Sequence, residues 1–305
     1  MVQSVILIAG SVLLSYFCFR EIGGWSEFYE RFHDGVWLKL IRPANDTTMP
    51  WLALIISVPF LGFYFWGNNQ MMVQRVLSAK SVNEGRLGFL FVAFLYIFTL
   101  FIFITPGMIA RGIDLFGVGN ILPNEIIDGN TLRSGYGIDT NEVYPRLVMQ
   151  LMPVGLIGIL VAAMISALTS ALSATLNSAS TLFTMDFYRT WKPNASSKTL
   201  VRVGQISSLI ALIVAVIWAP LLAEFASLVA YYQEFSSYLA PPIVGAFLAG
   251  LFWKRSTKNG SFYGLMFGLG FAAVIMILKF GFGIEAPFHF LFFVPILLVT
   301  SILVS

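Results

Sequence analysis

Hydroxyl and small side chains gather on one face of an apolar stretch near the middle of the sequence. At about 100° per residue, the members of this face fall within about 160° of helical arc; they are Ala163, Ser166, Ala167, Ser170, Ala171, Ser173, Ala174, Asn177 and Ser178. A hard cation such as Na+ takes several oxygen ligands, which hydroxyls and freed backbone carbonyls supply without burying a negative charge. Small residues also let membrane helices pack closely. The face therefore indicates a cation site, a packing surface, or both.

A second polar feature lies in the apolar stretch 226–252, which carries Gln233 and Glu234 and then two consecutive prolines, Pro241 and Pro242. Two prolines remove two amide donors, so we expect the helix to bend or break there. Gln233 lies about six residues from the centre of the stretch, well inside hydrocarbon depth. A buried amide and carboxylate indicate a functional site, unless Glu234 pairs with a lysine or arginine of another span.

A third feature is a run of four aromatic residues at 63–66, preceded by Pro59 and Gly62. Proline and glycine weaken a helix in mid-span, and a flat apolar stack beside flexible backbone suits a sugar ring or another small organic solute. The alternative is an aromatic belt at the cytoplasmic edge of the membrane.

The composition predicts that all three features lie in a membrane. Of the 305 residues, 58% are hydrophobic and 11% charged, whereas an ordinary soluble domain is about 45–50% apolar and 25% charged. The long apolar stretches lack strict alternation, which favours helices over a barrel; they fall at 1–19, 51–68, 88–110, 147–185, 203–222, 226–252, 261–280 and 287–305. We therefore expect an all-α integral membrane protein with about eight transmembrane helices in one domain.

The fourth stretch is too long for one crossing, and we expect a lead-in over 144–153 followed by a span over about 155–185. Placing Met1 at the cytoplasmic face makes the connections 69–87, 186–202 and 253–260 cytoplasmic. These hold ten basic residues against two acidic ones, as the positive-inside rule requires.

Few side chains in the sequence could support an enzyme. Cys18 is the single cysteine, which excludes an internal disulfide or a zinc ribbon. His33 and His289 are the two histidines, and the sequence has neither an HExxH motif nor a Walker A motif. No nucleophile–base pair stands at membrane depth, and the cations lie in loops between spans, so neither catalysis nor nucleic-acid binding is indicated.

Five collinear stretches resemble the sodium/solute symporter family, and within it the sodium–glucose cotransporter branch. They are WGNNQMMVQRVLSAKS at 66–81, PGMIAR at 106–111, YPRLVMQLMPVGLIG at 144–158, LNSASTLFTMDFY at 176–188 and GLFWKR at 250–255. The resemblance implies two inverted five-helix repeats in a plasma membrane, or in the inner membrane of a bacterium. It also implies that Na+, with no other cofactor, moves down its gradient and drives a solute inward.

By the family pattern, residue 1 falls at the start of the fifth core helix. The resemblance therefore implies that 1–305 is a single, partial transporter domain, truncated at both ends, in which the first four core helices are absent. Those helices normally supply half of the sodium ligands and part of the solute site.

The resemblance also implies roles for single residues in the small-and-hydroxyl face. Ala167 matches a position whose backbone carbonyl binds sodium, and Ser170 matches a hydroxyl ligand. The next family position usually carries a second hydroxyl, but here it is Ala171. Ser173 corresponds to a position used for an additional sodium ion in some members.

For the solute, the resemblance implies a contact from Gln233, which matches a sugar-binding glutamine. Three other solute positions depart from the pattern: Gly62 replaces an asparagine, Phe65 an inner-gate tyrosine and Tyr96 a lysine. Tyr64 and Trp66 keep the aromatic character of the gate. Glucose or galactose is therefore not implied as the solute.

The leading hypothesis is part of a Na+-coupled symporter that imports a sugar or a similar small polar solute. Two alternatives remain open at this point. Symporter-like domains also occur as sensory membrane modules, and a truncated gene can leave a remnant without function.

Overall fold

In the computed structural model, all regular secondary structure among the described residues is helical. The described residues are 2–33, 39, 41–44, 46, 50–116, 141–222, 225, 227–284 and 286–305. Among them, seven helical segments are long and apolar enough to cross a membrane: Val2–Ile22, Trp51–Asn68, Val82–Ala110, Val154–Trp191, Ser197–Leu222, Leu228–Phe252 and Lys258–Gly281. A shorter apolar helix spans Phe290–Val304. The predicted all-α membrane fold with about eight helices is confirmed.

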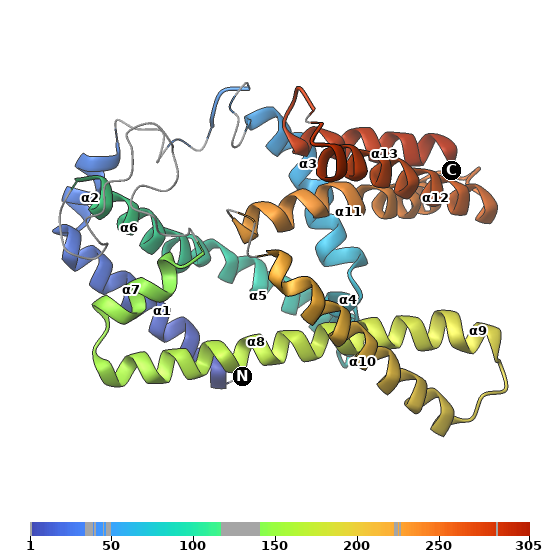
Figure 1. The fold of residues 1–305 in the computed structure, drawn as a ribbon, viewed down its shortest axis with the longest axis horizontal. Coiled ribbons are helices and arrows are strands. Elements are labelled where there is room, and N and C mark those ends of the chain that lie inside the picture. The colour runs from blue at the N-terminus through green and yellow to red at the C-terminus, as the bar shows by residue number, and fades with distance from the viewer. Residues whose placement is uncertain are drawn as a thin grey trace. The chain divides into compact units, whose positions relative to one another are not determined.

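The helices form two compact units, which we describe separately (Figure 1). Unit 1 comprises Met1–Leu38 and Lys80–Ser227, and unit 2 comprises Lys39–Ala79 and Leu228–Ser305. Unit 1 contains α1 (Val2–Ile22), α2 (Trp25–Phe32), α5 (Val82–Thr99), the π-helical turn η2 (Leu100–Ile104), α6 (Thr105–Phe116), α7 (Val143–Leu151), α8 (Val154–Leu182), the π-helical turn η3 (Phe183–Tyr188), α9 (Arg189–Trp191) and α10 (Ser197–Leu222). Unit 2 contains α3 (Trp51–Phe63), the π-helical turn η1 (Tyr64–Asn68), α4 (Gln70–Leu77), α11 (Leu228–Phe252), α12 (Lys258–Met276), the π-helical turn η4 (Ile277–Gly281), the 3-10 turn η5 (Phe290–Phe292) and α13 (Phe293–Val304).

Unit 1 is built around α1, which packs against α6, α7 and α8. Its core includes Leu14 and Cys18 of α1 with Leu160 of α8, all of them fully or almost fully buried. Pro153 separates α7 from α8 with an extended ψ of 141°, as expected of a residue without a backbone N–H that pre-sets the first helical turn. The predicted lead-in and long span are confirmed as α7 and α8.

In unit 2, α11, α12 and α13 lie against one another, and small residues let their backbones approach closely (Figure 1). The Ser301 hydroxyl of α13 lies 3.2 Å from the carbonyl oxygen of Pro242 and 3.1 Å from that of Gly264. A methyl group added at Gly268 would meet the Pro242 ring at 2.8 Å. Small-residue packing and hydroxyl-to-carbonyl contacts thus join three helices around the prolines of α11.

Of the bend or break expected at Pro241 and Pro242, the break is not seen, because α11 remains one helix from Leu228 to Phe252. The prolines leave the carbonyls of Ser237 and Tyr238 without their usual intrahelical donors. Both prolines and both of these residues are nevertheless buried between α12 and α13. Packing on two sides keeps the backbone helical where the local sequence alone would interrupt it.

We predict that Gly268→Ala lowers the thermal unfolding temperature of the purified chain in detergent. The added methyl group collides with a rigid proline ring, and overpacking of this kind costs about 1–3 kcal/mol. Gly270→Ala on the same helix is the matched control, because a methyl group there meets no atom within 4 Å. Equal unfolding temperatures for the two variants would contradict close packing of α12 on α11.

Candidate functional site

The predicted sodium residues lie on the middle of α8, the long helix of unit 1 (Figure 1). Neighbouring helices contact α8 near the start of the small-and-hydroxyl face and just beyond its end. The Ser166 hydroxyl donates to Oε1 of Gln3 on α1 at 2.6 Å, and further along α8 the Ser180 hydroxyl donates to the carbonyl of Gly204 on α10 at 2.8 Å. Between these contacts, Ser170, Ala171 and Ser173 are exposed. Part of the face therefore packs, and its middle stays open within the unit.

The hydroxyls on this face differ in how they are used. Ser173 donates to the carbonyl of Thr169 at 2.8 Å, and Thr169 donates to that of Ile165 at 2.8 Å, so both bond back to their own helix. The side-chain hydroxyl of Ser170 makes no hydrogen bond within the part of the chain that the structure describes. Its oxygen is available to a ligand. Because α8 is a continuous helix, the carbonyl of Ala167 offers its second lone pair rather than a freed oxygen.

The aromatic run lies where α3 gives way to the π-helical turn η1. Pro59 and Gly62 precede this change, as the sequence predicts for a weakened helix. A π-helical turn carries an extra residue and occurs often at functional sites. Nothing lies within 4 Å of where a Gly62 methyl group would point, so space is open beside the turn. Phe65 and Trp66 pack edge to face, with ring centroids 5.2 Å apart.

One polar atom of η1 stands out at its end. The side-chain nitrogen of Asn68 is buried and has no hydrogen-bond partner among the described residues. An amide of this kind costs free energy unless it is satisfied. Sequence reasoning did not choose Asn68 as a site residue, and an amide two residues after the end of the aromatic run is the signal that could have found it.

Gln233 is half-buried near the start of α11, and its carbonyl accepts a hydrogen bond from the Ser237 hydroxyl at 2.7 Å. The next residue, Glu234, accepts from the Tyr238 hydroxyl at 2.8 Å and from the ammonium of Lys279 on η4. The interpretation in which Glu234 pairs with a basic residue of another span is confirmed. The expectation that the cations lie in loops between spans is wrong for Lys279, which lies inside the apolar stretch 261–280. A lone lysine there is the signal that could have identified the partner.

The structure groups the predicted residues unit by unit. Gly62, Tyr64, Phe65 and Trp66 lie together on α3 and η1, and η1 contacts α11, the helix that carries Gln233. Tyr96 lies exposed on α5 of unit 1, the unit that also holds the sodium positions Ala167, Ser170, Ala171 and Ser173.

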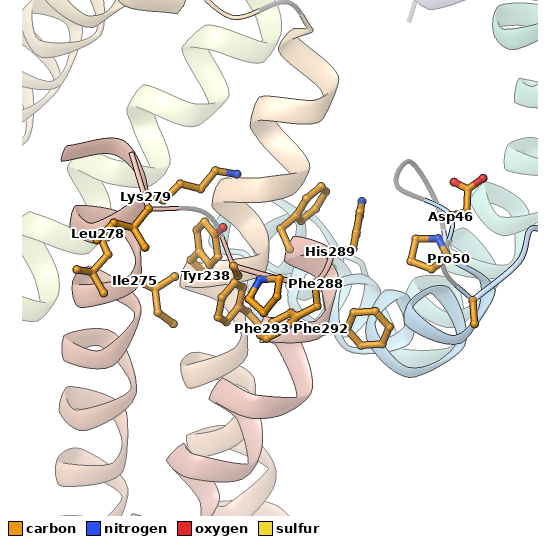
Figure 2. Close-up of a pocket in the computed structure, with 15 residues that line it drawn as sticks. Asp46, Pro50, Tyr238, Ile275, Leu278, Lys279, Phe288, His289, Phe292 and Phe293 are labelled. Atoms are coloured by element: carbon orange, nitrogen blue, oxygen red, sulfur yellow. The ribbon is translucent and has the colours of Figure 1, made fainter. Parts of the chain in front are cut away.

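A cavity of about 840 Å³ opens in unit 2, away from the predicted residues. Figure 2 shows Lys279 and Tyr238 toward one end, Phe288 and His289 in the middle, and Asp46 at the other end. No group of three or more histidine, cysteine or acidic residues in the described ranges could hold a metal ion.

The seven candidate spans in the described residues define a multi-pass membrane protein, and the small-and-hydroxyl face of α8 and the π-helical turn η1 are features that membrane transporters use. A model of the sodium:solute symporter family matches residues 1–268, and the chain belongs to this family. The family name joins sodium to a solute, and a multi-pass position in the plasma membrane agrees with the seven candidate spans among the described residues.

Similar curated proteins transport different solutes by name. The chain is 33% identical to a sodium/mannose cotransporter of Bos taurus over an alignment of 296 residues. This alignment covers 91% of this chain and 49% of that protein. It is 32% identical to sodium/glucose cotransporter 1 of Oryctolagus cuniculus, covering 99% and 50%. It is 33% identical to a sodium/myo-inositol cotransporter of Bos taurus, covering 93% and 43%. The chain thus spans about half the length of the curated relatives it matches.

Proposed function

We propose that this chain forms part of a Na+-coupled symporter that imports a sugar or a similar small polyol. The observation that carries the proposal is the open middle of the α8 face, where Ser170 has a hydroxyl without a partner in the described structure. A membrane helix that only packed would cover this face or bond its hydroxyls back to the helix. The position also matches a family sodium ligand.

The proposed sodium site takes oxygen ligands from one turn of α8. The carbonyl of Ala167 and the hydroxyl of Ser170 lie three residues apart and thus on one side of the helix. Ala171 supplies no second hydroxyl, so Ser170 carries a larger share of the binding here. Ser173 bonds back to Thr169 and would have to release that bond to serve an additional ion.

The solute end rests on polar and aromatic groups of unit 2. Gln233 offers two donors and an acceptor to the hydroxyls of a sugar or polyol. The aromatic side chains of Tyr64, Phe65 and Trp66 supply flat apolar surfaces for the ring. The relatives named for mannose, glucose and myo-inositol support a polyhydroxylated six-membered ring as the solute class.

The chain spans about half the length of the curated relatives it matches, and we propose that both sites also need ligands from outside these 305 residues. We predict that proteoliposomes with the 305-residue chain alone show no Na+-dependent accumulation of D-glucose, D-mannose or myo-inositol. Completing the carrier by fusing the chain to the part of a curated relative that it does not match should produce uptake. Concentrative uptake by the chain alone would contradict this part of the proposal.

In the completed carrier, Gln233→Ala should weaken solute binding while the sodium dependence changes little. Each lost hydrogen bond costs about 0.5–1.5 kcal/mol, which corresponds to a few-fold to tenfold loss of affinity. The measurement is the half-saturating solute concentration at saturating sodium. Gln205→Ala, at an exposed position of α10, is the matched control. An unchanged value for all three candidate solutes would make Gln233 a structural residue.

For sodium, Ser170→Ala should raise the concentration needed for half-maximal uptake at least several-fold, because a ligand oxygen is lost. Ser170→Thr keeps the oxygen and should be tolerated. Ala171→Ser adds a hydroxyl and should tighten the sodium dependence or leave it unchanged. A sodium titration of uptake at matched protein abundance tests all three variants. If Ser170→Ala leaves the titration unaltered, the face serves helix packing alone.

A further inference from the structure

Glu234 and Lys279 form a charged contact between two membrane segments of unit 2. The carboxylate belongs to α11 and the ammonium to η4, and Oε1 of Glu234 also accepts from the Tyr238 hydroxyl at 2.8 Å. The side chain of Glu234 is 15% exposed and that of Lys279 is 29% exposed. Both charges are therefore largely removed from water, and the pair differs from a surface ion pair that contributes little.

An aromatic contact between the residues that follow Glu234 and Lys279 fixes the register of α11 against η4. Phe235 of α11 stacks on Phe280 of η4, with ring centroids 5.2 Å apart and an interplanar angle of 26°. Two consecutive residues of α11 thus meet two consecutive residues of η4. A slip of either segment by one residue would break both contacts. We call these four residues, Glu234, Phe235, Lys279 and Phe280, the outer clamp.

The backbone of η4 presents Lys279 at this place. The segment Ile277–Gly281 is a π-helical turn, and the chain reverses at Gly283, whose φ is +67°. The N–H of Ile284 returns to the carbonyl of Leu278 at 3.0 Å and closes the helix end. A cation in the last turn also interacts favourably with the helix dipole. The lysine is therefore held at a defined helix terminus.

The two halves of α11 are held by different contacts. In the lower half of α11, which runs from the prolines to Phe252, Pro242 and Gly245 pack directly on α13. A methyl group added at Gly245 would lie 3.0 Å from the Ser301 side chain. Pro241 and Pro242 have no backbone N–H, so they donate no hydrogen bond to the preceding turn of α11. The upper half of α11, which precedes the prolines and carries Gln233, therefore receives two fewer backbone hydrogen bonds from the half that follows. The outer clamp holds this upper half together with Tyr238, whose ring lies 5.5 Å from that of Phe293 between centroids.

We propose that Glu234 and Lys279 are positioning residues that hold the upper half of α11 so that Gln233 faces the solute. Consecutive residues of a helix point about 100° apart, so fixing Glu234 against η4 fixes the direction of Gln233. A buried ion pair adds little net stability but leaves a costly lone charge when one partner is lost. The proposal rests on the proposed function for the role of Gln233 in solute binding.

The first experiment needs no transport. Cys18 is the single cysteine and is fully buried, so a C18A background with Q233C places one reactive thiol at the solute position. The rate of modification by a membrane-permeant maleimide is compared in the 305-residue chain with and without E234Q, K279Q, K279R and the exchange E234K/K279E. Glu142→Gln is the matched control, because Glu142 pairs with Arg146 at 2.8 Å on the exposed surface of α7.

We expect E234Q and K279Q each to change the modification rate at least threefold. K279R, which keeps the charge, and the exchange should both stay within twofold of the background, as should E142Q. Unchanged rates in E234Q and K279Q would overturn the proposal. An altered rate in K279R that matches K279Q would also overturn it, since the charge would then not be what positions the helix.

The second experiment uses the completed carrier. E234Q should raise the half-saturating solute concentration at least threefold while the sodium concentration for half-maximal uptake stays within twofold, and the exchange should restore the former. A merely structural role would lower the maximal rate through protein abundance and leave the half-saturating concentration unchanged, which would overturn the proposal. If no variant transports any of the three solutes, the proposed function fails, and the maleimide rates still decide whether the outer clamp positions Gln233.

Discussion

Inside a bilayer no water is at hand to satisfy a polar group, so each N–H, carbonyl and hydroxyl must find its partner within the protein. This requirement makes the described chain helical, and it governs the hydroxyls as well. Thr169, Ser173, Thr181 and Ser207 each donate to the carbonyl four residues earlier on their own helix. Polar side chains that escape this pattern are therefore informative, and Ser170 on the open face of α8 is one of them.

The same requirement explains how α11 carries polar and charged groups through hydrocarbon depth. Its two prolines deprive the helix of two donors, and its glutamate would be costly alone. Lys279 and Tyr238 both donate hydrogen bonds to one carboxylate oxygen of Glu234, and the Ser301 hydroxyl donates to the Pro242 carbonyl. Small residues make this feasible, because Gly264 and Gly268 bring the backbones of α12 and its neighbours close enough for a serine hydroxyl to reach two carbonyls.

Much of this architecture could be predicted from the sequence. Hydropathy located the spans, Pro153 divided α7 from α8, and Pro59 with Gly62 marked the place where α3 becomes a π-helical turn. The sequence predicted a bend or a break at Pro241 and Pro242, and α11 is not broken there, because α12 and α13 pack on both sides of it and local rules omit this packing. The partner of Glu234 could be predicted only as a class of residue, since the pairing with Lys279 joins positions 45 residues apart. The roles of Ala167, Ser170 and Gln233 come from the family resemblance and stay predictions.

Two buried side-chain polar atoms in the described part of the chain lack a hydrogen-bond partner, and their surroundings differ. Thr184 Oγ1 lies in η3, near the close approach of Gly204 on α10, so helix packing accounts for its burial. Asn68 Nδ2 lies at the end of η1, two residues after Trp66, where the aromatic run ends. Both are in π-helical turns, where the wider backbone changes the direction of side chains. Helix packing accounts for Thr184, whereas a solute bound at the proposed aromatic surface would supply the hydrogen-bond partner that the Asn68 amide lacks within the described residues.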